Sequence, residues 1–232
     1  MSYSKTIVCL AKSIKHGGYC IAGKELKHDR FAEWVRAVSN REDEEISSYE
    51  CTCTDGHEAS LLDILSIVML EPRPQAYQTE NHLIDPERRW HKKGRIDATT
   101  LEALIDTIDG TLWANGHHST YGINDRVPES VASGFSHSLA VIRPTHLDIC
   151  VETEGAEFGN PRRRTRAAFQ LNNFQYKLVV TDPVTRNKYW SQPGQHRLSE
   201  QALVCVSLGE AHDGYAYKLV AAVITPDTVQ AI

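Results

Sequence analysis

The sequence predicts a mainly β protein, and three observations lead to that prediction. Short apolar runs rich in valine and isoleucine recur along the chain, with turn-forming residues between them. From residue 138 onward these runs follow one another closely, a spacing typical of a small barrel or sandwich. Only residues 97–110 show the apolar spacing of an amphipathic helix. A chain of 232 residues has the length of one large domain or two small ones.

The first half of the chain begins with a predicted hairpin. Residues 5–11 and 19–23 are apolar runs, and the His-Gly-Gly sequence at 16–18 between them is a turn signal. Residues 33–39 alternate in the manner of a half-buried strand. Residues 61–70 are apolar at both odd and even positions, and the run is long enough for a helix. Its isoleucine and valine content and the prolines that follow it favour a buried strand instead.

The helix expected at 97–110 would place its apolar side chains on one face. Thr99 and Glu102 match a capping box at its beginning, and Gly110 suits its end. The apolar positions follow the i, i+3, i+4, i+7 pattern at Leu101, Leu104, Ile105 and Ile108.

The second half of the chain predicts a succession of strands. Within residues 166–182, interpreted as one strand, Phe174 and Tyr176 share parity with apolar neighbours and are expected in the core. Phe169 and Lys177 fall on the opposite face. The strands expected in this half are 138–144, 147–154, 166–182, 188–190, 202–209 and 217–226.

The composition is that of an ordinary globular protein, at 41% hydrophobic and 24% charged residues. No apolar run approaches the roughly 20 residues of a membrane-spanning helix. The first fifteen residues lack the features of a secretion signal. Four of the six cysteines lie in apolar runs, where a reduced thiol behaves as a small hydrophobe: Cys9, Cys20, Cys150 and Cys205. We therefore expect a cytoplasmic protein without membrane association or cofactor.

Basic residues are unevenly distributed along the chain. The formal net charge of −5 argues against broad, charge-driven coating of nucleic acid. Lysine and arginine are nevertheless concentrated in residues 1–30, 86–100 and 162–197, where they could act locally.

The sequence PRRRTR at 161–166 is the first candidate for nucleic-acid contact. Its arginines could neutralise phosphates, while Phe169 stacks on a base and Lys177 lies on the same non-core face. The alternative is a solvated loop that leads into an ordinary core strand. The candidate arginines are Arg162, Arg163, Arg164 and Arg166.

A second basic set flanks the first predicted hairpin. Lys12, Lys15 and Lys24 belong to the hairpin, and Arg36 lies on the next strand. The other basic residues of the set are His16, Lys27, His28 and Arg30. Together they could form a second basic rim, and a solvated charged face is again the alternative.

A metal site is weakly indicated at CTCTDGH, residues 51–57. Cys51, Cys53 and His57 could ligate zinc, but structural zinc sites prefer C-x₂₋₄-C pairs and four ligands. A C-x-C spacing places the two sulfurs on opposite sides of an extended chain. The pattern therefore favours an exposed loop with incidental thiols and no bound metal.

A catalytic site is also weakly indicated, in the long loop at 114–130. His117, His118 and Asp125 are residue types used in acid–base chemistry. No nucleophile elbow, zinc-protease motif or phosphate-binding glycine loop accompanies them. Glu80, within residues 79–81, is expected to order its own loop and not to act as a catalytic group.

Several segments occur in an order found in a known family. Residues 6–26 are similar to its opening hairpin, and residues 34–39 to its Trp-Ile-Arg-Pro-Val-Ser element, with Ala37 in place of proline. Further matching segments are 61–67, 78–85, 124–127, 179–183, 206–210 and 217–224. Through these segments nearly the whole chain resembles the bacterial dual OB-containing domain family. The resemblance implies two tandem OB-like β-barrels and no established activity. It also implies that Asp125 and Arg126, within residues 124–127, order their loop by local hydrogen bonds.

These observations lead to one functional hypothesis and two alternatives. OB barrels bind through one sheet face and its rimming loops, most commonly to oligonucleotides. We expect two domains, 1–130 and 131–232, that form a non-catalytic binding module for single-stranded DNA, RNA or nucleotides. The first alternative is a protein-interaction adaptor in a bacterial nucleic-acid-processing or defence system. The second is a hydrolase or nuclease that uses the histidine loop.

Overall fold

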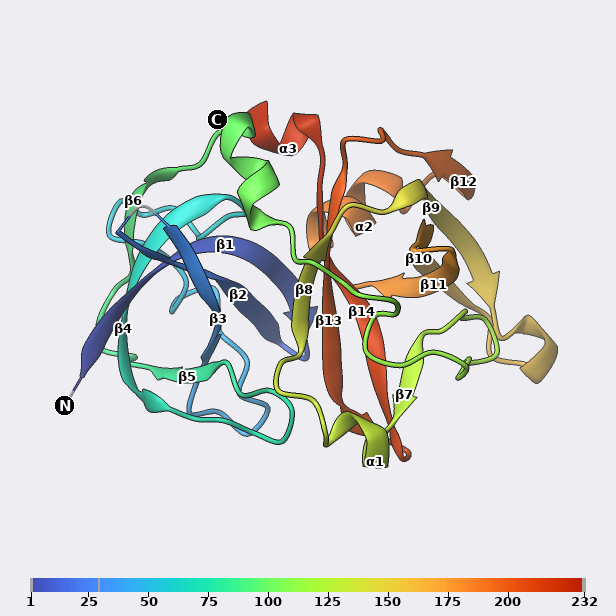
Figure 1. The fold of residues 1–232 in the computed structure, drawn as a ribbon, viewed down its shortest axis with the longest axis horizontal. Helices are drawn as coiled ribbons and strands as arrows, with labels where there is room; N and C mark the ends of the chain where they lie inside the picture. Colours follow the sequence, from blue (N-terminus) through green and yellow to red (C-terminus); the bar gives the residue numbers. More distant parts are fainter. Residues whose placement is uncertain (1, 29, 231–232) are drawn as a thin grey trace. The chain divides into compact units, whose positions relative to one another are not determined.

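The computed structural model describes residues 2–28 and 30–230, and the fold is mainly β (Figure 1). The chain divides into two compact units. Unit 1 comprises Met1–Ile105, Ser136–Leu139 and Pro226–Ile232, and unit 2 comprises Asp106–Phe135 and Ala140–Thr225. The domain boundary expected between residues 130 and 131 stays a prediction.

Unit 1 is built on one sheet whose strand pairings form a ring. β1 pairs with β2, β2 with β3 and β4 with β5, all antiparallel, while β3 pairs with β5 in parallel. A further antiparallel pairing of β4 with β1 completes the ring, and β6 extends it from β4. The strands are β1 (Tyr3–Lys15), β2 (Gly18–Lys27), β3 (Arg30–Val38), β4 (Asp63–Pro72), β5 (Asn81–Ile84) and β6 (His91–Arg95).

The expected strands of unit 1 are confirmed. The opening hairpin is β1–β2, residues 33–39 lie largely in β3, and the ambiguous run at 61–70 is mostly β4. At Gly23 the two strands of the hairpin approach so closely that an added Cβ would lie 1.9 Å from the Val8 carbonyl oxygen. Only glycine fits this position without a shift of the backbone.

The helix expected at 97–110 is wrong in type and length. The segment forms a 3₁₀ helix, η1 (Ala98–Leu104), whose N-cap is Asp97 instead of the predicted Thr99. Leu104 is buried in unit 1, whereas Ile108 packs against the core of unit 2. The apolar residues that suggested one helix face are therefore divided between two cores, and the backbone is extended at Ile105.

Unit 2 contains a sheet with the order β12-β9-β10-β11-β14-β13-β8, and β7 pairs with β14. Its strands are β7 (Arg126–Pro128), β8 (Leu139–Ile142), β9 (Thr145–Glu154), β10 (Arg162–Leu171), β11 (Phe174–Val180), β12 (Gly194–Arg197), β13 (Leu203–His212) and β14 (Tyr215–Ile224). Its helices are α1 (Glu129–Ala132), η2 (Ala156–Phe158) and α2 (Pro183–Tyr189), whereas α3 (Pro226–Gln230) belongs to unit 1.

The two units share an order of strand pairing. In unit 2 the antiparallel meander β9-β10-β11 is followed by a parallel pairing of β11 with β14, and β14 pairs antiparallel with β13. In unit 1 the meander β1-β2-β3 is likewise followed by a parallel β3–β5 pairing and an antiparallel β5–β4 pairing. The fold class predicted from the sequence, mainly β with two OB-like units, is confirmed.

The segment 166–182 is a hairpin and not the single strand that we expect from its sequence. Asn172 and Asn173 form the turn with φ values of 48° and 67°, the backbone that a two-residue hairpin requires. Phe169 pairs directly with Tyr176 across the hairpin, so both side chains lie on the same face, in the core of unit 2. Phe174, expected in the core, is 41% exposed at the beginning of β11.

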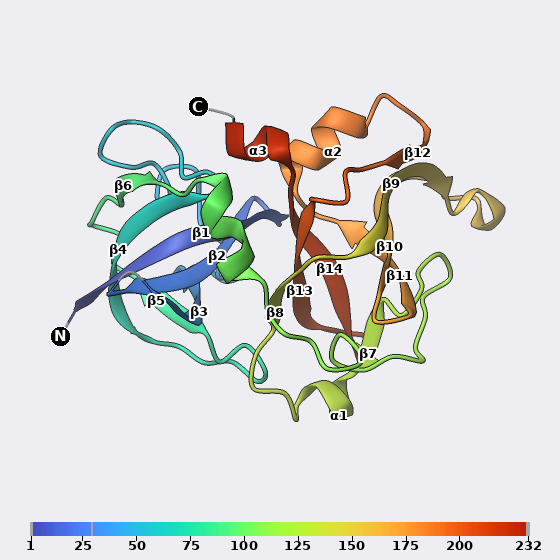
Figure 2. The same cartoon turned by 45° about the horizontal axis from the view of Figure 1, so that its top comes forward.

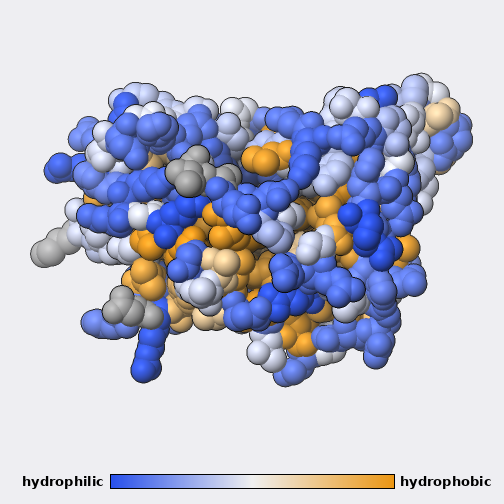
Figure 3. Space-filling view, turned by 90° about the horizontal axis from the view of Figure 1, so that it is seen from above, coloured by the Kyte–Doolittle hydropathy of each residue, from blue (hydrophilic) through white to orange (hydrophobic). Residues whose placement is uncertain are grey.

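The strand expected at 188–190 is also wrong, because these residues end a helix. Asp182 caps α2 by accepting a hydrogen bond from the Val184 backbone N–H, and Pro183 occupies the first turn. Figures 1 and 2 both show α2 on the same side of unit 2 as β12. Figure 3 views the protein from that side, where unit 2 presents mainly hydrophilic side chains.

Within residues 2–28 and 30–230, no helix combines the length and the apolar character needed to cross a membrane.

Candidate nucleic-acid interface

The arginines of PRRRTR lie at the beginning of β10 in two different environments. Arg162, Arg163 and Arg164 are exposed, whereas Arg166 is only 6% exposed. The difference arises because β10 enters the sheet between β9 and β11, and the neighbouring segments cover it from Thr165 onward. The structure therefore keeps three of the four arginines available to a ligand.

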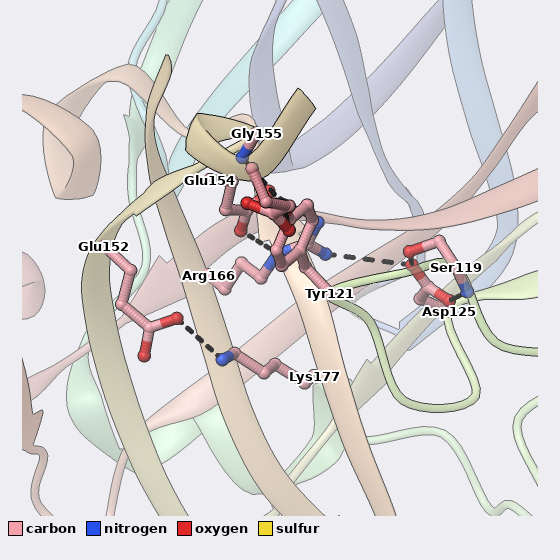
Figure 4. Close-up of polar contacts among 9 residues, drawn as sticks. Ser119, Tyr121, Asp125, Glu152, Glu154, Gly155, Arg166 and Lys177 are labelled. Atoms are coloured by element: carbon pink, nitrogen blue, oxygen red, sulfur yellow. Dashed lines mark hydrogen bonds and ion pairs between the residues drawn. The ribbon is translucent and has the colours of Figure 1, made fainter. Parts of the chain in front are cut away.

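Arg166 is held in a buried ion pair. Its Nε lies 2.6 Å from Glu154 Oε1 and its Nη2 lies 3.1 Å from Glu154 Oε2, and Nη1 is 3.7 Å from Asp125 Oδ2 (Figure 4). Two parallel hydrogen bonds make this a strong and directional contact. Arg166 thus joins β10, β9 and the 114–126 loop, contrary to the expectation of an exposed phosphate contact.

The same loop is fixed by Asp125 and its neighbours. Asp125 accepts hydrogen bonds from the Ser119 backbone N–H, at 2.7 Å, and from the Ser119 hydroxyl (Figure 4). An added Cβ at Gly122 would lie 1.8 Å from the Asp125 carboxylate, so a larger residue there would displace that carboxylate from its position. The Tyr121 hydroxyl donates to Glu157 and accepts from the Gly155 backbone N–H at 2.8 Å. The role in loop ordering expected for Asp125 is confirmed.

Lys177 is half-buried and already paired. Its Nζ donates to Glu152 Oε2 at 2.8 Å, and its backbone exchanges two hydrogen bonds with Ile123 of the loop (Figure 4). A phosphate at Lys177 would have to compete with the Glu152 carboxylate. Lys177 therefore contributes less net positive charge to the surface than its sequence position suggests.

A buried lysine, Lys218, holds the beginning of the 114–126 loop by hydrogen bonds. Lys218 Nζ donates to the Ala114 carbonyl at 2.6 Å and to Asn115 Oδ1 at 3.0 Å. Burial lowers the pKa of Lys218 to about 7, and the nearby Asp125 carboxylate partly opposes that shift. Sequence reasoning overlooked Lys218 because it lies within the apolar strand β14. The sequence pattern of that strand gives no sign that this lysine is buried and bonded to another segment.

The two histidines of the loop do not form a catalytic set with Asp125. His118 Nδ1 accepts a hydrogen bond from the Asn124 backbone N–H at 2.8 Å, and the His117 ring lies 6.0 Å from that of Tyr215. Among the described residues, no hydrogen bond joins either histidine to Asp125. Both side chains are engaged in contacts that order the loop.

The aromatic residue expected to stack on a base lies in the core. Phe169 is buried and stacks on Tyr176 with ring centroids 5.3 Å apart. The Tyr176 hydroxyl accepts hydrogen bonds from the Leu112 backbone N–H and from Asn115. Phe169 therefore supports the sheet from within, and the prediction that it faces away from the core is wrong.

Trp190, which sequence reasoning missed, lies beside the exposed arginines. Its side chain is 40% exposed at the end of α2. The Arg163 guanidinium carbon and that of Arg186 each lie 5.8 Å from the indole centroid, and Arg163 Nη1 donates to the Trp190 carbonyl at 3.0 Å. The sequence does show an aromatic residue, Trp190, shortly after Arg186 and Lys188. Because residues 188–190 were interpreted as a strand, Trp190 was not considered as part of a basic surface.

The second basic set does not form the expected rim on unit 1. Lys24 is buried and donates to the Leu104 carbonyl at 2.9 Å. Arg36 is buried as well, with Nη2 at 2.7 Å from Ser138 Oγ and 3.2 Å from Glu80 Oε1. Both cations hold neighbouring segments of unit 1 in place. The structural role expected for Glu80 is confirmed.

The other members of that set are divided between paired and exposed positions. Lys12 pairs with Glu58 at 2.7 Å and lies 4.4 Å from the Tyr19 ring centroid, and Lys15 is half-buried. Lys27 is exposed and pairs with Glu25 at 2.9 Å, whereas His28 and Arg30 are exposed, so only part of the positive charge expected along the first hairpin is engaged within the unit.

The cysteines of CTCTDGH are buried, and the exposed loop expected for them is wrong. Burial raises the pKa of Cys51 and of Cys53 to about 11, so both thiols are neutral near pH 7. His57 is exposed. In the described part of the chain, no three histidine, cysteine or acidic side chains are grouped closely enough to hold a metal ion. The absence of zinc stays a prediction.

Comparison with known proteins agrees with the fold. Neither the curated proteins nor the solved structures give a match. The model of the dual OB-containing domain family matches residues 5–223, which is nearly the whole chain and includes both units. The chain therefore belongs to the dual OB-containing domain family.

Proposed function

We propose that unit 2 binds single-stranded nucleic acid on the surface formed by Arg162, Arg163, Arg164, Arg186 and Trp190, which we call the Arg–Trp surface. The observation that supports this proposal is the exposed indole of Trp190, with the guanidinium groups of Arg163 and Arg186 each 5.8 Å from its ring centroid. Arg162 and Arg164 are exposed on the same stretch of β10 but on the opposite side of the sheet from Arg163, so a strand that contacts all three arginines passes around the exposed beginning of β10.

This surface combines the two interactions that single strands need. An aromatic side chain stacks on an unpaired base, a contact worth about 1–3 kcal/mol, and arginines neutralise the adjacent phosphates. The bases of a duplex are already stacked on one another, so an exposed indole favours single strands. Membership of an OB family adds support, since oligonucleotides are common ligands of OB folds.

The footprint that we propose is short and independent of sequence. The exposed arginines are few, and the net charge of −5 would repel a strand that extends far beyond them. Contacts to phosphates and stacking on one ring carry little information about base identity. We therefore expect modest affinity, similar for DNA and RNA of equal length.

The test is the affinity of a fluorescent oligonucleotide of about 15 nucleotides for the protein and two variants. Trp190→Ala removes the stacking ring, while Phe158→Ala removes another exposed aromatic ring of unit 2, one that is 71% exposed. We expect Trp190→Ala to weaken binding about fivefold to a hundredfold and Phe158→Ala to leave it nearly unchanged. Equal affinities of all three proteins would overturn the role of Trp190.

A second candidate function is a protein-interaction adaptor, and it is supported by the exposed apolar side chains Phe158 and Val184. If no single-stranded oligonucleotide binds to the protein at low salt, the adaptor function replaces nucleic-acid binding as the proposed function. We also propose a cytoplasmic location in a bacterial cell. All six cysteines are free thiols, which fits a reducing compartment.

A further inference from the structure

A polar pocket of about 490 Å³ in unit 1 has no part in the proposed function. It lies where the beginning of β1, the 49–54 segment and the connection before β6 meet. Its volume is within the range of pockets that hold small ligands. The polar and charged residues that matter here are Ser4, Thr54, Glu87, Arg88, Arg89 and His91.

One of its cations is held in place by the protein. The Arg89 guanidinium lies 4.0 Å from the Tyr49 ring centroid, and its Nη1 donates to the carbonyls of Tyr49 and Thr52 at 3.2 and 3.3 Å. These contacts use one nitrogen of the group and fix its orientation. A pre-oriented guanidinium loses little side-chain entropy when a ligand binds.

The other polar groups of the pocket complement Arg89. Thr54 is positioned by a hydrogen bond from its backbone N–H to the Trp90 carbonyl, at 2.9 Å, and its hydroxyl lies 3.2 Å from His91 Nδ1. Arg88 is exposed at the pocket, and no ion pair in the described part of the chain engages its side chain. The lining of the pocket thus includes two guanidinium groups and one carboxylate, that of Glu87, and its charge balance is positive.

We propose that this pocket binds the phosphate group of a small phosphate monoester. Guanidinium groups match the geometry of phosphate oxygens, and the hydroxyl groups supply additional donors for the remaining oxygens. Carboxylate ligands offer only two oxygens and would use fewer of the donors present. This site lies in unit 1, so an experiment that overturns it leaves the proposal for the Arg–Trp surface of unit 2 unaffected, and the reverse also holds.

The experiment measures binding of inorganic phosphate, a nucleoside monophosphate and the corresponding nucleoside to the whole protein by titration calorimetry. We expect both phosphate-bearing probes to bind and the nucleoside to bind at least about tenfold more weakly. Tighter binding of the monophosphate than of inorganic phosphate identifies an organic ester as the ligand. Tighter binding of inorganic phosphate would overturn the monoester assignment.

Two single variants localise the site. Arg88→Ala removes a pocket cation, and Lys93→Ala removes an exposed cation of β6 that does not line the pocket. We expect Arg88→Ala to weaken monophosphate binding by about tenfold or more and Lys93→Ala by less than about twofold. Equal effects of the two variants, no binding of either phosphate probe, or equal binding of the nucleoside would overturn the proposal.

Discussion

Arg166 and Glu154 form a buried, two-hydrogen-bond ion pair between the neighbouring strands β10 and β9. Two residues earlier on β10, Arg164 is exposed. Alternate residues of a strand point to the same side of the sheet, so the two arginines differ in what covers them and not in the face they occupy. The 114–126 loop reaches Arg166 through Asp125. One basic segment therefore serves both the stability of unit 2 and its exposed surface.

The first prediction concerns this difference between the two arginines. Arg166→Ala leaves the Glu154 carboxylate buried without its cation, so we expect the free energy of unfolding to fall by about 3–5 kcal/mol. Arg164→Ala should leave it nearly unchanged, because that side chain is exposed. Urea denaturation of the two variants measures both effects. Equal stability of the variants would show that the Arg166–Glu154 pair contributes nothing to the fold.

The second prediction concerns the aromatic residues of the β10–β11 hairpin. Phe169→Ala should lower the free energy of unfolding by about 3–5 kcal/mol, because the ring is buried against Tyr176 in the core. Phe174→Ala should cost clearly less, since its ring is largely exposed. Chemical denaturation of both variants provides the measurement. A larger loss for Phe174→Ala would contradict the register of the hairpin.

The third prediction follows from the lowered pKa of Lys218. Between the folded-state pKa of about 7 and the ordinary lysine value, the unfolded chain keeps a proton that the folded protein releases. Stability should therefore rise with pH across this window, by at most about 1.4 kcal/mol per pH unit. Below pH 7 the lysine is protonated in both states and its contribution no longer changes.

Lys218→Met is the control for this pH dependence. The buried cysteine thiols have raised pKa values and oppose the trend as pH rises, but they are common to both proteins. The difference in unfolding free energy between the wild type and Lys218→Met, measured from pH 6.5 to pH 9.5, isolates the lysine. A difference that stays constant or falls with rising pH would contradict a lowered pKa.

The fourth prediction concerns the histidine loop. Replacing His117 and His118 together by alanine should leave oligonucleotide affinity largely intact, because neither side chain belongs to the Arg–Trp surface. Binding and thermal stability are measured on the same preparation. A folded double variant that has lost a measurable turnover would instead favour the hydrolase alternative.

Much of the fold could be predicted from local patterns. The first hairpin and the strand at 61–70 follow from β-branched runs between turn residues, and those patterns depend only on neighbours in the chain. The segment 97–110 could not be interpreted in this way. Leu104 is buried in unit 1, whereas Ile108 is partly buried against the core of unit 2, so the apolar spacing of one predicted helix face corresponds to contacts with two different cores.

The candidate site was only partly predictable, for a different reason. The sequence identifies Arg162 and Arg164 as charged, but the exposure of an arginine depends on what other segments place around it. The Asn172–Asn173 turn reverses the chain, so Phe169 lies opposite Tyr176 although the two appeared to have opposite parity. A two-asparagine turn signal was present in the sequence, and its recognition would have placed Phe169 in the core.

The salt dependence of oligonucleotide binding tests the central claim most directly. The wild type is compared with Arg162→Ala/Arg164→Ala and with the matched variant Arg30→Ala/Lys93→Ala, which removes two exposed cations from unit 1. Each phosphate neutralised on a single strand contributes about 0.7 to the slope of log K against log salt. We predict that the first variant binds more weakly and that its slope is flatter by about 1.4, while the matched variant keeps the wild-type slope. Unchanged affinity and slope in Arg162→Ala/Arg164→Ala, or the same change in both variants, would contradict a nucleic-acid site on the Arg–Trp surface.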